Sequence, residues 1–135
     1  MNTKMIMTSS AFVLGITGIL LTFLPDETAM FIIPAPNIPF RLMLQILGAL
    51  YFGFAMLNWM ARDSAIGGIY NRPVTVANLS HFTVGALALI KGAVTGHQFP
   101  VFFPVMTLLY TVFASGFGVL LFKHPDVPVS REKKH

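Results

Sequence analysis

The chain has 135 residues, of which 55% are hydrophobic and only 10% charged, and its mean hydropathy is +0.72. Soluble domains carry about a quarter charged residues, so this composition excludes an ordinary soluble domain and predicts a membrane protein. The net charge of +4 is spread over loops and tail, which excludes a basic nucleic-acid-binding face, and the absence of cysteine excludes thiolate catalysis and cysteine-ligated metals.

Four long apolar runs predict transmembrane helices. Each is close to the roughly 20 helical residues that cross a hydrocarbon core about 30 Å thick. Unbroken runs of this length favour helices over the alternating strands of a membrane barrel. We therefore expect an all-α, integral membrane four-helix bundle within residues 1–124, with antiparallel helices running up and down in turn. The spans are expected at residues 5–24, 42–61, 74–94 and 101–122.

The segments around these spans also carry predictions. The first run is longer than a usual signal-peptide core and no small-residue cleavage pair follows it, so it is expected to be retained. The proline-rich, apolar connection after it is expected to lie in the outer interface. The link at residues 95–99 is so short that the spans beside it must be adjacent and antiparallel. The basic segment 125–135 is expected to be a disordered cytoplasmic tail.

The positions of the basic residues predict the orientation, because Lys and Arg are enriched in cytoplasmic loops. Only Arg41 and Lys91 fall on the side away from the termini. Both termini are therefore expected in the cytoplasm, and the protein in a plasma membrane, the inner membrane of a bacterium. The basic residues on the side of the termini are Lys4, Arg62, Arg72, Lys123, Arg131, Lys133 and Lys134.

Small residues recur at helix-packing spacing, which allows helix backbones to approach closely. Close packing within one bundle and a homo-oligomer interface both fit this pattern. In the second span we expect leucine at Ala49 or Gly53 to force helices apart. The small residues are Ala11, Gly15 and Gly18 in the first span, Ala49 and Gly53 in the second, and Ala114 and Gly118 in the fourth.

Polar side chains in the second and third spans predict a polar layer toward the cytoplasm. The bilayer penalises each such group unless it finds a partner or a cavity. Asn58 and Asn78 lie at similar depth on either side of a short connection, and a neutral His81 would offer them one donor and one acceptor. The candidate ligand-binding residues are Asn58, Trp59, Arg62, Asn78 and His81. A network that only fixes helix register and a site for a ligand or proton remain alternatives.

Two further features refine this layer. Asn78 and His81 are three residues apart and share a helix face that Gly85 and Ala88 extend. Gln45 and Lys91 form a secondary polar site toward the outer side. There Lys91 is expected to extend to the headgroups, with a pair to Asp26 or Glu27 as the alternative.

Several absences narrow the chemistry. No Asp or Glu lies within a predicted span, which disfavours a carboxylate-driven proton or cation antiporter, and no histidine pair has metal-ligand spacing. Phosphate-loop, nucleophile-elbow and paired-carboxylate motifs are missing as well. No catalytic residue, metal or cofactor is therefore predicted, and a non-enzymatic role is favoured.

Two resemblances bear on the class of protein. The size and four-span plan resemble the small multidrug resistance transporters, but those carry a membrane-embedded Glu in the first helix, where this chain has only Ser and Thr as polar groups. A second pattern resembles one in small uncharacterised four-span bacterial membrane proteins, and that resemblance implies no activity. It comprises Gln45-x-x-Gly48-Ala49, Asn58-Trp59-x-Ala61-Arg62, Arg72-Pro73-Val74 and Ala77-Asn78-x-x-His81.

The sequence thus favours a small non-enzymatic integral membrane protein. It is expected to bind a lipid-like or small amphipathic ligand, or a partner protein, at the polar layer between the second and third spans. An oligomeric transporter or channel subunit is the alternative, and a membrane enzyme acting on a lipid is third. A pocket lined by Asn58, Asn78 and His81 would favour ligand binding. The lipid bilayer and another copy or membrane protein are the expected partners, and nucleic acid is not.

Overall fold

The computed structural model describes residues 3–63, 71–95, 100 and 102–122, and within them every regular element is a helix. The expected all-α class is confirmed, and four of these helices are long and apolar enough to cross a membrane. The tail predicted at 125–135 lies outside the described residues. The helices are α1 (Thr3–Phe23), α2 (Pro25–Ile32), α3 (Ile38–Ala61), α4 (Asn71–Val94) and α5 (Phe102–Phe122).

Helix α3 begins earlier than the predicted residue 42 because local capping outweighs the proline content of its first turn. The Asn37 side chain accepts a hydrogen bond from the Phe40 N–H at 2.9 Å. Pro39 lies in the first turn, where a missing N–H costs little. Helix α4 likewise begins before its predicted start, with Pro73 inside its first turn.

Helix α2 is an element that the sequence analysis did not predict. Its first position is Pro25, and the acidic Asp26 and Glu27 in its first turn suit the positive end of the helix dipole. It ends at Ile32, before Pro34. The Asp26 carboxylate lies 2.7 Å from Arg41 Nη1, so an ion pair ties α2 to the start of α3.

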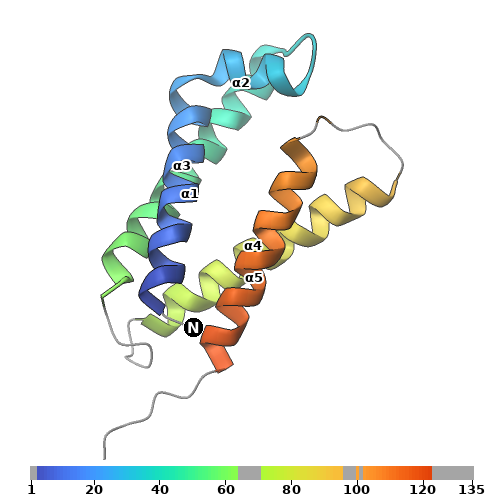
Figure 1. The fold of residues 1–135 in the computed structure, drawn as a ribbon. Coiled ribbons are helices and arrows are strands. Elements are labelled where there is room, and N and C mark those ends of the chain that lie inside the picture. Colours follow the sequence, from blue (N-terminus) through green and yellow to red (C-terminus); the bar gives the residue numbers. More distant parts are fainter. Residues whose placement is uncertain (1–2, 64–70, 96–99, 101, 123–135) are drawn as a thin grey trace, which may run out of the picture.

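The long helices form two pairs. Successive long helices run in opposite directions, with α1 packed on α3 and α4 on α5, while α2 lies over the far ends of α1 and α3 (Figure 1). The pairing of α4 with α5 is what the short link between them predicts. Contacts between the two pairs are few, and α4 runs obliquely to the other long helices. The contacts that join the pairs run between α3 and α4 and between α1 and α5.

The tightest packing in the first pair is a glycine contact between α1 and α3. A Cβ atom built on Gly18 would lie 2.8 Å from the Gly48 carbonyl oxygen, and one built on Gly48 would lie 2.8 Å from that of Gly18. Gly53 meets nothing within 4 Å, and Ala49 is exposed. The expectation that Ala49 and Gly53 form a close contact is therefore wrong, because the α3 face that meets α1 is centred on Gly48.

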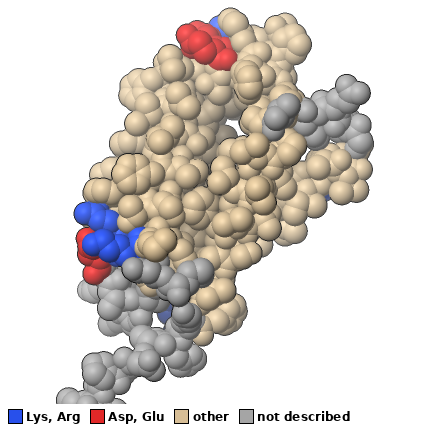
Figure 2. Space-filling model, in the orientation of Figure 1, with Lys and Arg blue, Asp and Glu red and all other residues tan. Residues whose placement is uncertain are grey.

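Charged side chains gather at the two ends of the molecule. On the face shown in Figure 2 they leave a long uncharged stretch between those ends, which suits helices that contact lipid. At the N-terminal end, Lys4 Nζ lies 2.7 Å from Asp63 Oδ1 and joins α1 to the end of α3. The hydrogen bond from Lys4 and the positive charge of Lys4 lower the pKa of Asp63. This contact therefore contributes at neutral pH and is lost as acid protonates Asp63.

The glycine contact predicts a sharp difference between two alanine substitutions on the same helix. Gly48→Ala should lower the free energy of unfolding by about 1–3 kcal/mol, because its methyl group meets backbone atoms that cannot turn aside. Gly53→Ala is the matched control and should leave stability equal or slightly higher. Thermal unfolding in one detergent measures both. Equal melting temperatures would contradict the close contact at Gly48.

Candidate functional site

Three buried polar side chains join α1, α3 and α4. Asn58 and Asn78 donate to each other's carbonyl oxygens at 2.8 and 2.6 Å, forming a reciprocal amide pair. Asn58 also donates to the Ser10 hydroxyl at 2.9 Å. All three side chains have 0% exposure. We call Ser10, Asn58 and Asn78 the asparagine junction.

The junction satisfies its own hydrogen bonds. Ser10 donates to the Met7 carbonyl at 3.0 Å, and Asn78 donates its second amide hydrogen to the Val74 carbonyl at 2.9 Å, both within their own helices. Neither asparagine has an unpartnered buried side-chain atom. In lipid, such a closed network holds helices in register and offers no free group to a ligand. The predicted contact between Asn58 and Asn78 is present, and it fits the structural alternative for this layer.

His81 lies one helical turn beyond Asn78, among aromatic rings instead of in the junction. Its imidazole stacks on Phe54 with ring centroids 5.0 Å apart and meets Tyr51 edge-on at 5.4 Å. Its Nε2 atom lies 3.3 Å from the Tyr110 hydroxyl, its one hydrogen bond among the described residues. The predicted bonds from His81 to the two asparagines do not form, because the ring turns toward α5.

Tyr51 and Tyr110 complete this polar group. Their hydroxyls form a short hydrogen bond between α3 and α5, and both side chains are buried. Gly85 makes the arrangement possible, because any Cβ at that position would collide with the Tyr110 ring. We call Tyr51, His81 and Tyr110 the hydroxyl cluster. It links the two helix pairs above the asparagine junction.

The remaining predicted residues lie apart from both groups. The Arg62 guanidinium lies 3.6 Å from the centroid of the Trp59 ring, so these two side chains stack on each other. Trp59 also meets Phe12 edge-on, on the outer face of α1 and α3. Arg62 further pairs with Asp63 at 3.2 Å. The structure does not bring Trp59 or Arg62 to the asparagine junction.

The secondary polar site is also divided. Gln45 donates to the Thr22 carbonyl on α1 at 3.4 Å, which is a contact within the first helix pair. Lys91 is exposed in the last turn of α4. Asp26 pairs with Arg41 in place of Lys91. Extension of the Lys91 side chain to the lipid headgroups stays a prediction.

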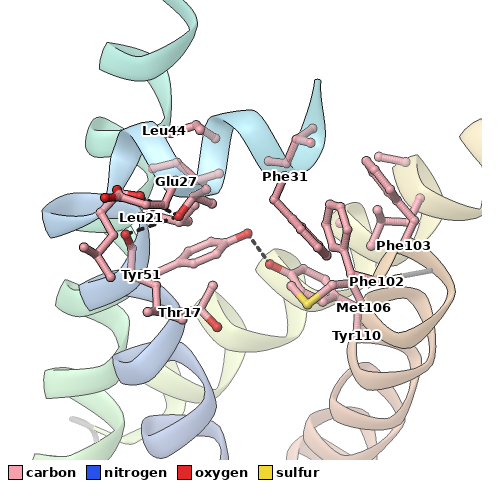
Figure 3. A pocket seen from close by; sticks show the side chains of 18 residues that line it. Thr17, Leu21, Glu27, Phe31, Leu44, Tyr51, Phe102, Phe103, Met106 and Tyr110 are labelled. Carbon is pink, nitrogen blue, oxygen red and sulfur yellow. Dashed lines mark hydrogen bonds between the residues drawn. The ribbon is translucent and has the colours of Figure 1, made fainter. Parts of the chain in front are cut away.

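A cavity of about 640 Å³ lies between the two helix pairs. All five helices contribute to its lining, which is mostly leucine and aromatic side chains. In Figure 3 the Tyr51 and Tyr110 rings extend toward one another from α3 and α5, and Phe31 of α2 approaches Phe102 of α5. The polar lining residues are Thr17, Glu27, Thr28 and the two tyrosines of the hydroxyl cluster.

The cavity differs from the site that the sequence predicted. Neither Asn58, Asn78 nor His81 lines it, although His81 reaches it through the hydroxyl of Tyr110. Gly85 and Ala88, predicted to extend the face of Asn78 and His81, do line it. Part of the predicted helix face therefore borders the cavity, farther along α4 than Asn78 and His81.

Sequence reasoning assigned no site role to Tyr51 and Tyr110. Their positions are 59 residues apart, and an aromatic residue in a span is also typical of packing and of the interface belt. Ser10 was one of several hydroxyls in the first span, and nothing in its spacing distinguished it. The one available signal was Gly85, a small residue on the polar face of α4 that leaves room for a ring.

The polar groups of this region are amides, hydroxyls and one imidazole. Among the residues that the structure describes, no three His, Asp or Glu side chains gather as metal ligands. The hydroxyl cluster donates and accepts hydrogen bonds beside an apolar space. Comparisons with protein-family models, with curated proteins and with solved structures gave no match for this chain.

The asparagine junction predicts non-additive substitutions. Asn58→Leu, which is close to asparagine in size, should lower the free energy of unfolding by about 1–3 kcal/mol, because it leaves the Asn78 amide buried without its partner. The double variant Asn58→Leu/Asn78→Leu should cost less than the sum of the single changes. Unfolding of all three variants in detergent measures the coupling.

Gln45→Leu is the control for that cycle. It removes an amide with one long hydrogen bond within the first helix pair, and it should show no coupling to Asn78→Leu. Strictly additive losses for Asn58 and Asn78 would contradict the reciprocal amide pair.

Proposed function

We propose that this chain is a non-enzymatic integral membrane protein that binds a lipid-like or small amphipathic ligand in the cavity between its two helix pairs. The cavity is the observation that supports this proposal. Its volume of about 640 Å³ falls within the roughly 300–1,000 Å³ typical of small-molecule sites. Apolar walls with a few polar groups suit a molecule with one long apolar part and one polar end.

The hydrogen bonding of the polar groups favours the cavity over the asparagine junction as the binding site. The junction is closed and internally satisfied, so a ligand there would have to break existing hydrogen bonds. The tyrosine hydroxyls stand at the wall of an apolar space instead. Binding in the cavity would therefore leave the joint between the helix pairs intact.

A transport role is the second candidate. The position of the polar contacts at one side of the cavity favours it. The asparagine junction and the hydroxyl cluster join the pairs on one side of the cavity, and the helices diverge beyond them (Figure 1). A cavity bounded at one depth by a closed polar contact is the arrangement that alternating access requires. Passage of a ligand would require the junction to open.

We propose further that both termini face the cytoplasm of a bacterial inner membrane. The excess of Lys and Arg on the side of the termini supports this orientation. A reporter active only in the cytoplasm should function when fused after His135, and one active only outside should not. The same two reporters inserted after Asn37, between α2 and α3, should give the opposite pattern. An active external reporter at His135 would overturn the orientation.

Ligand binding predicts that filling the cavity removes a bound molecule. Ala88 on α4 lines the cavity, so Ala88→Trp should occupy its space. Native mass spectrometry of the full chain, extracted with its lipids, should show an adduct on the natural chain that falls at least several-fold in the variant.

Ala49→Trp is the matched control, because Ala49 is exposed on α3 and does not line the cavity. It should retain the adduct at the natural level, with a melting temperature close to that of Ala88→Trp. Equal adduct levels in the two variants would contradict binding in the cavity.

A further inference from the structure

The lining of the cavity carries a single charge among its described residues. Of the 18 residues that line it, only Glu27 has an acidic side chain, and none is Lys or Arg. Glu27 is exposed and makes no ion pair within the described part of the chain. Its neighbour Asp26 is already neutralised by Arg41 at 2.7 Å. The cavity therefore presents one unpaired carboxylate.

The same end of the cavity is rich in aromatic faces. The Phe31 and Phe102 rings lie 5.5 Å apart and bridge α2 and α5, and the Phe103 ring lies 4.4 Å from that of Phe102. Phe31 and Glu27 both lie on the short helix α2, so both belong to the part of the cavity that α2 borders. The face of an aromatic ring attracts a cation.

The position of Glu27 is fixed by the contacts of α2. The Thr28 hydroxyl donates to the Leu24 carbonyl at 2.7 Å, and Ala29 is fully buried against the helix pair. These contacts hold the α2 backbone next to Glu27. Glu27 therefore lies on a packed helix beside the cavity and not in a loop.

We infer that the cavity selects lipophilic cations. This inference rests on the proposed ligand site and adds its charge preference. A cation would place its charge near Glu27 and the phenylalanine rings, and its apolar groups would pack between α1, α3 and α4. An anionic ligand would bring a second negative charge to the Glu27 carboxylate beside a low-dielectric space, which is unfavourable.

Tetraphenylphosphonium and tetraphenylborate test the inference directly, because they have nearly the same shape and opposite charge. Binding of each to the full chain in nanodiscs of zwitterionic lipid is measured by titration calorimetry, with empty nanodiscs subtracted. Tetraphenylphosphonium should bind more tightly than tetraphenylborate. Glu27→Gln should weaken the cation about threefold to fivefold, the range of an exposed charge pair, and should not weaken the anion.

Asp26→Asn is the matched control. It changes the net charge equally at the adjacent position, but that carboxylate does not line the cavity. It should change cation binding much less than Glu27→Gln does. Both residues are exposed, and helix content by circular dichroism checks that both variants fold.

The other outcomes overturn the inference in distinguishable ways. Equal losses in the two variants would assign the effect to general surface potential. Tighter or equal binding of tetraphenylborate would overturn the charge preference, while the proposed function stands if Ala88→Trp still removes the adduct. If neither probe binds and Ala88→Trp has no effect, both proposals fail together.

Discussion

The reciprocal amide pair between Asn58 and Asn78 is the interaction on which the arrangement of the two helix pairs depends. Each pair is stabilised internally, the first by the approach of Gly18 to Gly48 and the second by aromatic packing around Phe82. Between the pairs, apolar surface has little reason to associate, because lipid tails solvate it equally well. Buried amides differ, since lipid offers them no partner. They specify where the pairs meet.

The hydroxyl cluster extends that joint toward the cavity. Tyr51, His81 and Tyr110 come from three helices and combine ring packing with hydrogen bonds. One side of the cluster is therefore structural and the other is a surface that a ligand can contact. The fold thereby places uncharged hydroxyls at the wall of the cavity. The one carboxylate among the described lining residues lies on α2, outside the four long helices.

Features that depend on residues close together in the sequence could be predicted, whereas features that depend on how the helices pack could not. Runs of about 20 apolar residues fix the four spans locally, and the short connection between α3 and α4 sets Asn58 opposite Asn78. Helix α2 was missed because Pro34 and Pro36 suggested an irregular segment, although they lie after its end. The partners of His81 depend on how α4 is rotated and inclined toward α5. The cavity depends on the angle between the pairs, which no periodicity in the sequence encodes.

The oblique course of α4 couples the cavity to the thickness of the bilayer. A helix in a thick bilayer stands more upright and one in a thin bilayer inclines, each at a modest energetic cost per ångström. Because the two pairs are fastened mainly at the asparagine junction and the hydroxyl cluster, a change in inclination of α4 and α5 is taken up at the opposite end. There the ring contact between Phe31 and Phe102 spans the gap. Acyl-chain length would thus act on the part of the cavity where α2 meets α5.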